Sequence, residues 1–248
     1  GADTLTGNNN ADVLQGQDGA DTLDGGAGDD TLDGGADEDV INGGAGDDSL
    51  TGGEENDTFF YDAAADMSDA GDAGDVIADF NDNSDEDVIG FDVFGTAASG
   101  ADNFFAGFAS GEFKVLDTDG ITAGASLSAG ASWKTVSGAT ANFSLTGIIS
   151  GGFDTGSNNY FATASLSGAI DLFEAYLTSL ALAKGTGLTA LGFMALSELY
   201  DGTDHYLAVA FLTNAGSAIT AGEADIRVIN LDDHDIETAD ITFLQFNS

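Results

Sequence analysis

The sequence predicts a mainly β protein with two parts, an N-terminal parallel solenoid and a β-rich C-terminal part with one or two helices. Three observations predict this fold class: a nine-residue repeat at the start, a concentration of acidic residues in the same region, and short alternating apolar runs further on. We place the division at residue 95, with the repeats and a flanking segment over 1–95 and a second domain over 96–248.

The repeat keeps a strict interval of nine residues. An aspartate recurs in each unit, a large apolar residue follows two positions later, and each unit after the first opens with glycine. A disordered acidic segment would not keep seven units in phase. The aspartates are Asp3, Asp12, Asp21, Asp30, Asp39, Asp48 and Asp57, and the apolar residues are Leu5, Leu14, Leu23, Leu32, Ile41, Leu50 and Phe59.

This spacing dictates a geometry. Three residues centred on the apolar position form a short strand with one side chain pointing inward. The six residues before it must turn the chain sharply, which favours glycines that tolerate positive φ. Two units then make one coil of a parallel solenoid, and successive coils stack about 4.8 Å apart. The repeated aspartates must therefore stack as well.

The charge of the chain selects its partners. At pH 7 the formal net charge is -40, and 27 of the 44 acidic residues lie in residues 1–95, which contain no lysine or arginine. This surface excludes nucleic acid and direct docking on anionic lipid, because both need basic residues. A block with one sign of charge needs cations to become compact.

Calcium is the cation that fits. Two carboxylates about 4.8 Å apart repel by roughly 3–4 kcal/mol at an effective dielectric of 20. Calcium accepts 6–8 oxygen ligands from carboxylates and backbone carbonyls, whereas magnesium demands a tight octahedron and keeps its waters. We expect several calcium ions whose binding supplies folding free energy. The predicted ligands are the seven repeat aspartates, Asp75, and carbonyl-bearing turn glycines, namely Gly25, Gly26, Gly28, Gly34, Gly43, Gly44 and Gly46.

The nonapeptide G-G-x-G-x-D-x-U-x, in which U is large and apolar, resembles the calcium-binding repeat of RTX proteins, the hemolysin-type family exported by type I secretion. The resemblance covers roughly residues 1–60, and "GDVIADFNDNSDEDVIGFDVFG" at 74–95 resembles the segment that follows the repeats in many members. It implies a parallel β-roll in which each calcium lies between one turn and the turn a full coil later. The aspartate at repeat position six is then the side-chain ligand.

Some units depart from the pattern. Asn8, Asn9 and Asn10 replace three residues of one turn, and Asp37 and Glu55 replace the fourth-position glycine in two others. We expect weaker or distorted calcium sites at these turns.

Residues 79–87 offer further oxygen ligands beyond the repeats. An EF-hand is disfavoured because Ser84 stands where that loop needs glycine and Gly90 where it needs glutamate. A roll-closing calcium site that uses Asp75, Asp79 or Asp87 is one interpretation, and a solvated turn between two buried strands is the other.

The C-terminal part reads as strands with one clear helix. The helix is expected over 171–185, with Asp171 as N-cap, Lys184 in the last turn, and Leu172 in an apolar stripe facing the core. The segment 188–200 is ambiguous between helix and strand. Strands are expected within 112–116, 141–149, 205–213, 224–231 and 239–246.

No catalytic centre is predicted, and we expect that the chain is not an enzyme. It has no cysteine, no H-E-x-x-H and no G-x-S-x-G motif. His234 fits a charged surface turn and His205 a strand edge better than general-base roles. A glycosidase carboxylate pair cannot be distinguished from calcium ligands by sequence.

These observations favour a secreted, extracellular protein that folds on calcium and builds a structure at the cell exterior, such as a surface-layer, filament or adhesin subunit. No apolar run approaches the length that spans a bilayer, and no N-terminal signal peptide is visible. The expected partners are calcium, further copies of the chain in a polymer or lattice, and the type I secretion machinery. That machinery would read a segment within the last ~50 residues, where Asp240 precedes Ile241, Phe243 and Leu244.

Two other interpretations remain open at this point. The chain could be the C-terminal calcium-folding and secretion module of a larger extracellular enzyme, such as a protease, a lipase or a polysaccharide-modifying enzyme. It could also be a binding module for glycans or ice, which only the small, threonine-containing strands suggest.

Overall fold

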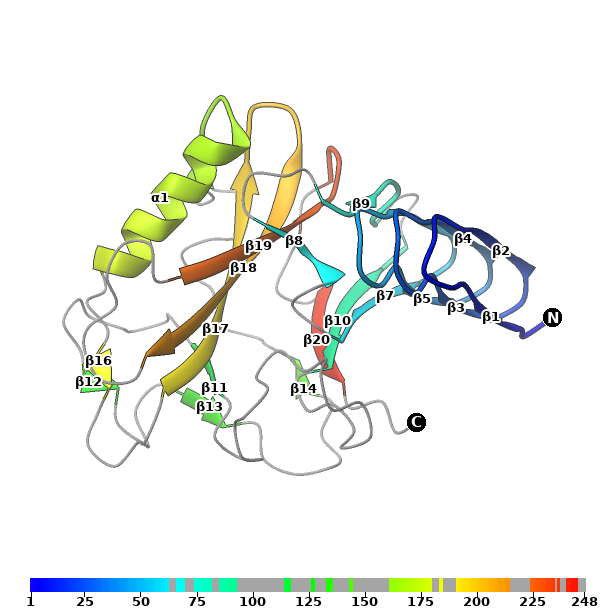
Figure 1. Cartoon of the computed structure of the whole chain (residues 1–248), viewed down its shortest axis with the longest axis horizontal. Helices are drawn as coiled ribbons and strands as arrows, with labels where there is room; N and C mark the ends of the chain where they lie inside the picture. The colour runs from blue at the N-terminus through cyan, green and yellow to red at the C-terminus, as the bar shows by residue number, and fades with distance from the viewer. Residues whose placement is uncertain are drawn as a thin grey trace.

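The computed structural model describes the whole repeat region and the principal strands of the C-terminal part. The coils of the repeat region stack into a parallel roll, and longer strands with one described helix lie beyond its C-terminal end (Figure 1). The described residues are 1–62, 66–69, 74–81, 85–92, 114–116, 126–127, 133–135, 143–144, 161–179, 183–184, 191–214, 224–234, 236 and 240–244. The predicted fold class, a mainly β chain that begins with a parallel β-roll, is confirmed.

Each coil of the roll gives one strand to each of two sheets, and both sheets continue into the C-terminal part. The first sheet runs in spatial order through β1 (Thr4–Thr6), β3 (Thr22–Asp24), β5 (Val40–Asn42), β7 (Thr58–Tyr61), β10 (Val88–Asp92), β20 (Ile241–Leu244) and β14 (Phe143–Ser144). The second runs through β13 (Trp133–Thr135), β11 (Lys114–Leu116), β17 (Leu191–Tyr200), β18 (His205–Asn214), β19 (Ala224–Asn230), β9 (Val76–Ile77), β6 (Ser49–Glu54), β4 (Thr31–Ala36) and β2 (Val13–Asp18).

Four short strands complete the described sheets. Of these, β15 (Phe161–Ala162) pairs with β17, and β8 (Ser68–Asp69) pairs with β19. A separate pair consists of β12 (Ser126–Leu127) and β16 (Ala183–Lys184). The five segments predicted as strands each contain one, although parts of 112–116, 141–149 and 239–246 lie outside the described residues. The ambiguous segment 188–200 contains strand β17.

The apolar residues of the repeat stack in register inside the roll. From the second coil onward each is at most 1% exposed, while Leu5 and Leu14 in the outermost coil are partly buried. From β1 to β6 the core is thin, with one inward apolar side chain per strand as the spacing predicts, whereas β7 also buries Phe60 and Tyr61. One row is Leu5, Leu23, Ile41, Phe59, Ile89 and Ile241, and the other is Leu14, Leu32, Leu50 and Ile77.

A strand from the C-terminal part pairs with the roll through the same kind of backbone hydrogen bond that joins the coils of the roll. In the repeats, Ser49 N donates to Asp30 O at 2.9 Å, and at the junction Asn230 N donates to Asp75 O at 2.9 Å. The buried side chains of both parts form one hydrophobic cluster. The division at residue 95 stays a prediction about domains, and both sides of it contribute to the same two sheets.

The predicted bounds of the helix were wrong. Helix α1 spans Leu166–Ser179, so Asp171 lies inside it and Lys184 lies in β16. The start is set by Ser165, whose hydroxyl accepts from Gly168 N at 3.3 Å, a better cap than an aspartate in mid-pattern. Leu172 is 44% exposed, and the buried stripe is instead Ala169, Ile170, Phe173 and Leu177.

Within the described ranges, no helix combines the length and the apolar character needed to cross a bilayer.

We predict that Ile241→Ala destabilises the roll although it lies in the C-terminal part. Ile241 is 1% exposed and pairs in register with Ile89, so truncation leaves a cavity in the shared core. The expected loss is about 2–5 kcal/mol in urea unfolding at saturating calcium. Leu172→Ala, at an exposed helix position, is the control and should change stability by less than about 0.5 kcal/mol. Equal stability of the two variants would contradict the shared core.

Candidate metal centre

Nine aspartates form two rows, one along each side of the roll. In each row the backbone N–H of one aspartate donates to Oδ1 of the next, at 2.6–2.9 Å. The seven repeat aspartates and Asp75 all take part, so the structure brings the predicted carboxylates together. The first row is Asp3, Asp21, Asp39, Asp57 and Asp87, and the second is Asp12, Asp30, Asp48 and Asp75.

The second carboxylate oxygen of five of these aspartates has no hydrogen-bond partner. This holds for Oδ2 of five residues that are at most 2% exposed. A buried carboxylate that lacks a partner is strongly unfavourable, which makes these atoms the strongest sign of an absent cation. The five are Asp21, Asp30, Asp39, Asp48 and Asp75.

A backbone carbonyl of the next coil lies close to three of these oxygens, those of Asp21, Asp30 and Asp39, at the turn glycines. A Cβ atom added to Gly34 would lie within 2.7 Å of both Asp39 Oδ2 and Gly52 O, which belongs to the next coil. At Gly25, the Cβ would lie within 2.5 Å of both Asp30 Oδ2 and Gly43 O. Oxygens of one turn and of the turn a full coil later therefore converge, and a set of oxygens alone suits a hard cation such as calcium.

The burial of like charges perturbs the carboxylates. Desolvation is the main cause, and it raises the pKa of Asp48 to about 6, that of Asp57 to about 7 and that of Asp75 to about 8. Neighbouring carboxylates of the same row add to each rise, while the N–H donated by the preceding aspartate opposes it. Without a cation, burial therefore favours the protonated form at these three aspartates.

The turn glycines serve the site through their backbone conformation. Gly26, Gly28, Gly44 and Gly46, at repeat positions two and four, all have positive φ. On the other side of the roll the same positions hold three other residues, Gln17, Asp37 and Glu55, with φ of 77–80°. These residues are forced into a conformation that L-residues disfavour by roughly 1–2 kcal/mol.

The three aspartates proposed to close the roll play different parts. Asp75 ends the second row with its Oδ2 open. Asp79 accepts from Gly52 N and Gly53 N at 3.0 and 2.9 Å, which ties residue 79 to the last repeat turn. Asp87 ends the first row. Of the three, Asp75 retains the geometry of a cation ligand.

Sequence reasoning missed two neighbours of Asp75. Asp66 continues the nine-residue interval, yet the second row passes from Asp48 to Asp75, and Asp66 lies buried beside them. Tyr61 is 1% exposed and its hydroxyl lies close enough to interact with Asp75, but not in hydrogen-bonding geometry, so Tyr61 Oη stays unsatisfied. The repeat interval pointed to Asp66, whereas no sequence signal pointed to Tyr61.

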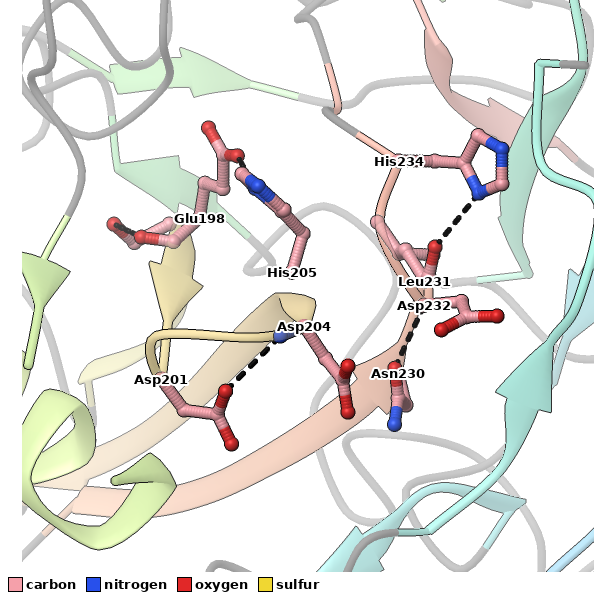
Figure 2. Close-up of polar contacts among 9 residues, drawn as sticks. Glu198, Asp201, Asp204, His205, Asn230, Leu231, Asp232 and His234 are labelled. Carbon is pink, nitrogen blue, oxygen red and sulfur yellow. Dashed lines mark hydrogen bonds and ion pairs between the residues drawn. The ribbon is translucent and has the colours of Figure 1, made fainter. Parts of the chain in front are cut away.

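His205 lies in β18, and His234 lies in the turn that follows β19 (Figure 2). His205 Nδ1 lies 2.5 Å from Oε1 of Glu198, a fully buried residue of the neighbouring strand, so His205 has a partner that the sequence did not indicate. His234 Nδ1 donates to Leu231 O, 3.1 Å away, within this turn.

The predicted ligands combine carboxylates with backbone carbonyls, so they do not form a cluster of side chains alone. In the part of the chain that the structure describes, no three His, Cys, Asp or Glu side chains converge as a metal cluster. Sites of the kind described here take one or two carboxylates and complete their shells with backbone carbonyls, so such a cluster is not required.

The comparison with protein families agrees with this geometry. The family model described as "RTX calcium-binding nonapeptide repeat (4 copies)" matches residues 1–32 and again residues 33–67. The roll is built from RTX calcium-binding repeats. No curated protein matches the chain. The RTX match ends where the second aspartate row departs from its regular interval.

We predict that Gly34→Ala disrupts the calcium site of its turn. The added Cβ would occupy the space between Asp39 Oδ2 and Gly52 O, which cannot move apart without disturbing the strand pairing. Calcium affinity should fall at least tenfold and stability by about 1–3 kcal/mol, measured by calorimetric titration and by urea unfolding. Thr31→Ala, at an exposed position of the same coil, should leave both values unchanged.

We predict that Asp37→Gly stabilises the roll by about 1 kcal/mol, because glycine adopts the φ of 77° without strain. The adjacent Glu38→Gly removes the same charge at a position without positive φ, and it should destabilise by about 0.5–1 kcal/mol. Thermal unfolding in calcium measures both. Equal effects would mean that lost charge, and not backbone strain, governs this turn.

We predict that the calcium-free roll is more stable in acid. The raised pKa values of Asp48, Asp57 and Asp75 mean that the folded state binds protons more tightly than the unfolded chain. This stabilisation is complete below the unfolded pKa and is lost as pH rises through about 6 to 8. Far-UV circular dichroism of the chelated protein should show more β structure at pH 5 than at pH 9. Loss of structure on acidification would contradict the burial of these carboxylates.

Proposed function

We propose that the protein is a calcium-dependent structural subunit of the cell exterior, which folds on calcium after export and assembles into a surface layer, a filament or an adhesin. One observation carries the proposal: the buried rows of aspartates with unpartnered Oδ2 atoms. A roll that depends on cations for neutralisation suits a compartment where free calcium is abundant, because extracellular calcium modules work at 10⁻⁴–10⁻³ M. The proposed role involves no catalytic step.

In this proposal the repeat aspartates, Asp75 and the turn glycines hold the calcium ions. Asp Oδ2 and the glycine carbonyl of the next coil supply the ligands at each turn. The ions neutralise the rows and bridge adjacent coils, so ion binding and folding become one event. Before export, at low free calcium, the same charges would keep the repeats unfolded and able to pass through a type I channel. The export segment would include β20 and the residues around it.

An exposed apolar side chain supports assembly. Val13 on β2 is 72% exposed, whereas the apolar residues inside the roll are buried. Contact of this surface with a second copy would remove the side chain from water, and a repeated head-to-tail contact would give an open polymer.

Electron microscopy with and without millimolar calcium tests the proposal. Wild-type protein should form ordered fibres or sheets in calcium, and a chelator should dissolve them. The matched variant is Val13→Lys, which places a charge at this exposed position and should give folded but unassembled protein. A monodisperse wild-type monomer at high concentration in calcium would contradict assembly. Circular dichroism on the same samples reports calcium-driven folding separately.

A further inference from the structure

One turn of the roll differs from the others in how its aspartate is satisfied. At residues 7–12, Asp12 Oδ2 accepts two hydrogen bonds from Asn8, one from the backbone N–H and one from the side-chain amide, both at 2.8 Å. The equivalent atoms of Asp30 and Asp48, in the next two turns on the same side, have no partner. In this turn, two N–H groups therefore already direct the positive ends of their dipoles at the carboxylate of Asp12.

The orientation of the Asn8 amide follows from its neighbours. Its other end accepts from Asn9 N at 2.9 Å and from the Asn10 side-chain amide. A backbone N–H can only donate, so the atom facing Asn9 is Oδ1 and the atom facing Asp12 is the NH₂ group. The three asparagines thus form one closed network around Asp12.

The backbone of this turn also differs. Gly26, Gly28, Gly44 and Gly46 have positive φ at repeat positions two and four, whereas Asn8 and Asn10, at the same positions, do not. Asp12 Oδ2 also lies further from the opening glycine: 2.9 Å from the ideal Cβ position of Gly7, against less than 2.5 Å for its counterparts in the next two turns. The carboxylate is drawn toward Asn8 and away from the place where the oxygens of the other turns converge.

We propose that the turn at residues 7–12 takes no calcium, and that the amide network of Asn8 replaces the ion there as a metal-independent closure of the turn. A cation would have to approach Asp12 Oδ2 past two N–H donors, whose positive ends repel it. The inference rests on the proposed calcium binding at the other turns. It goes beyond that function by assigning which repeat unit is exempt.

The opposite end of the roll shows a related closure. Asp87, the last member of the first row, accepts from Asn81 N at 2.8 Å through Oδ2 and donates its own N–H to Asn81 Oδ1 at 2.7 Å. Asn81 Nδ2 in turn donates to Asp240. Asparagine hydrogen bonds therefore satisfy Asp12, the first member of one row, and Asp87, the last member of the other, whereas Asp21, Asp30, Asp39, Asp48 and Asp75 keep an open oxygen.

Native mass spectrometry of the full chain in calcium tests the proposal by counting bound ions. Asp12→Asn should keep the wild-type number of calcium ions, whereas Asp30→Asn should lose one. The loss of an ion from Asp12→Asn would overturn the amide closure and leave the proposed function intact. An unchanged count in both variants would overturn the proposed calcium role of the rows as well.

A gain-of-site variant covers the case in which Asp30→Asn does not fold. Asn8→Gly combined with Asn10→Gly restores glycine at positions two and four and removes the amide that faces Asp12. It should bind one calcium ion more than wild type. Asn9→Gly is the matched control, because only the backbone of Asn9 takes part in the network, and its count should not change. Equal counts for the double variant and the control would overturn the proposal.

Discussion

The repulsion among buried carboxylates governs the rest of this structure. Each coil of the roll places an aspartate within hydrogen-bonding distance of the next coil, and one of its two oxygens accepts the N–H of its neighbour in the row. The other oxygen is buried without a partner in five of these residues. Backbone pairing and a thin apolar core must therefore hold together two rows of like charge. A divalent cation between coils converts the same geometry from repulsive to attractive.

The same rows connect the repeats to the C-terminal part. Asp75 closes the second row with its side chain, and its carbonyl accepts the N–H of Asn230 in β19. In the other sheet, β20 pairs with β10 and continues the apolar row that starts at Leu5. Neutralisation of the last carboxylates therefore supports strands that lie more than 150 residues further along the chain. In the described residues, buried side chains of the roll and of the C-terminal sheets form one hydrophobic cluster.

The nine-residue interval predicted the roll, its inward-facing apolar rows and its aspartate rows, because in a solenoid the position in sequence sets the position in space. The interval could not predict where the rows leave it. Asp75 follows Asp48 in place of Asp66, at the point where β9 pairs with β19 and Tyr61 lies beside Asp75. The helix start was missed because Ser165 caps it through a local turn with Thr163, and the partner of His205 was missed because antiparallel pairing of β17 and β18 brings Glu198 alongside it. These features depend on contacts between segments that carry no repeat.

The turns that depart from the repeat consensus do so in two different ways. Asp37 and Glu55 keep the positive φ of the glycines that they replace, and so preserve the turn at the expense of strain. The asparagines at 8–10 instead change the turn and satisfy Asp12 directly. A departure from the consensus can therefore weaken a site or replace its ion, depending on whether the new side chain reaches the carboxylate.

Hydrogen exchange of the backbone amides in residues 1–61, with calcium and after complete chelation at neutral pH, tests the central claim most directly. The account predicts slow exchange throughout the inner strands of the roll in calcium and rapid exchange once the ions are removed, because the charged rows can no longer be buried. Equal protection in the absence of every divalent ion would contradict it, since the coils would then be held together by packing and hydrogen bonds alone.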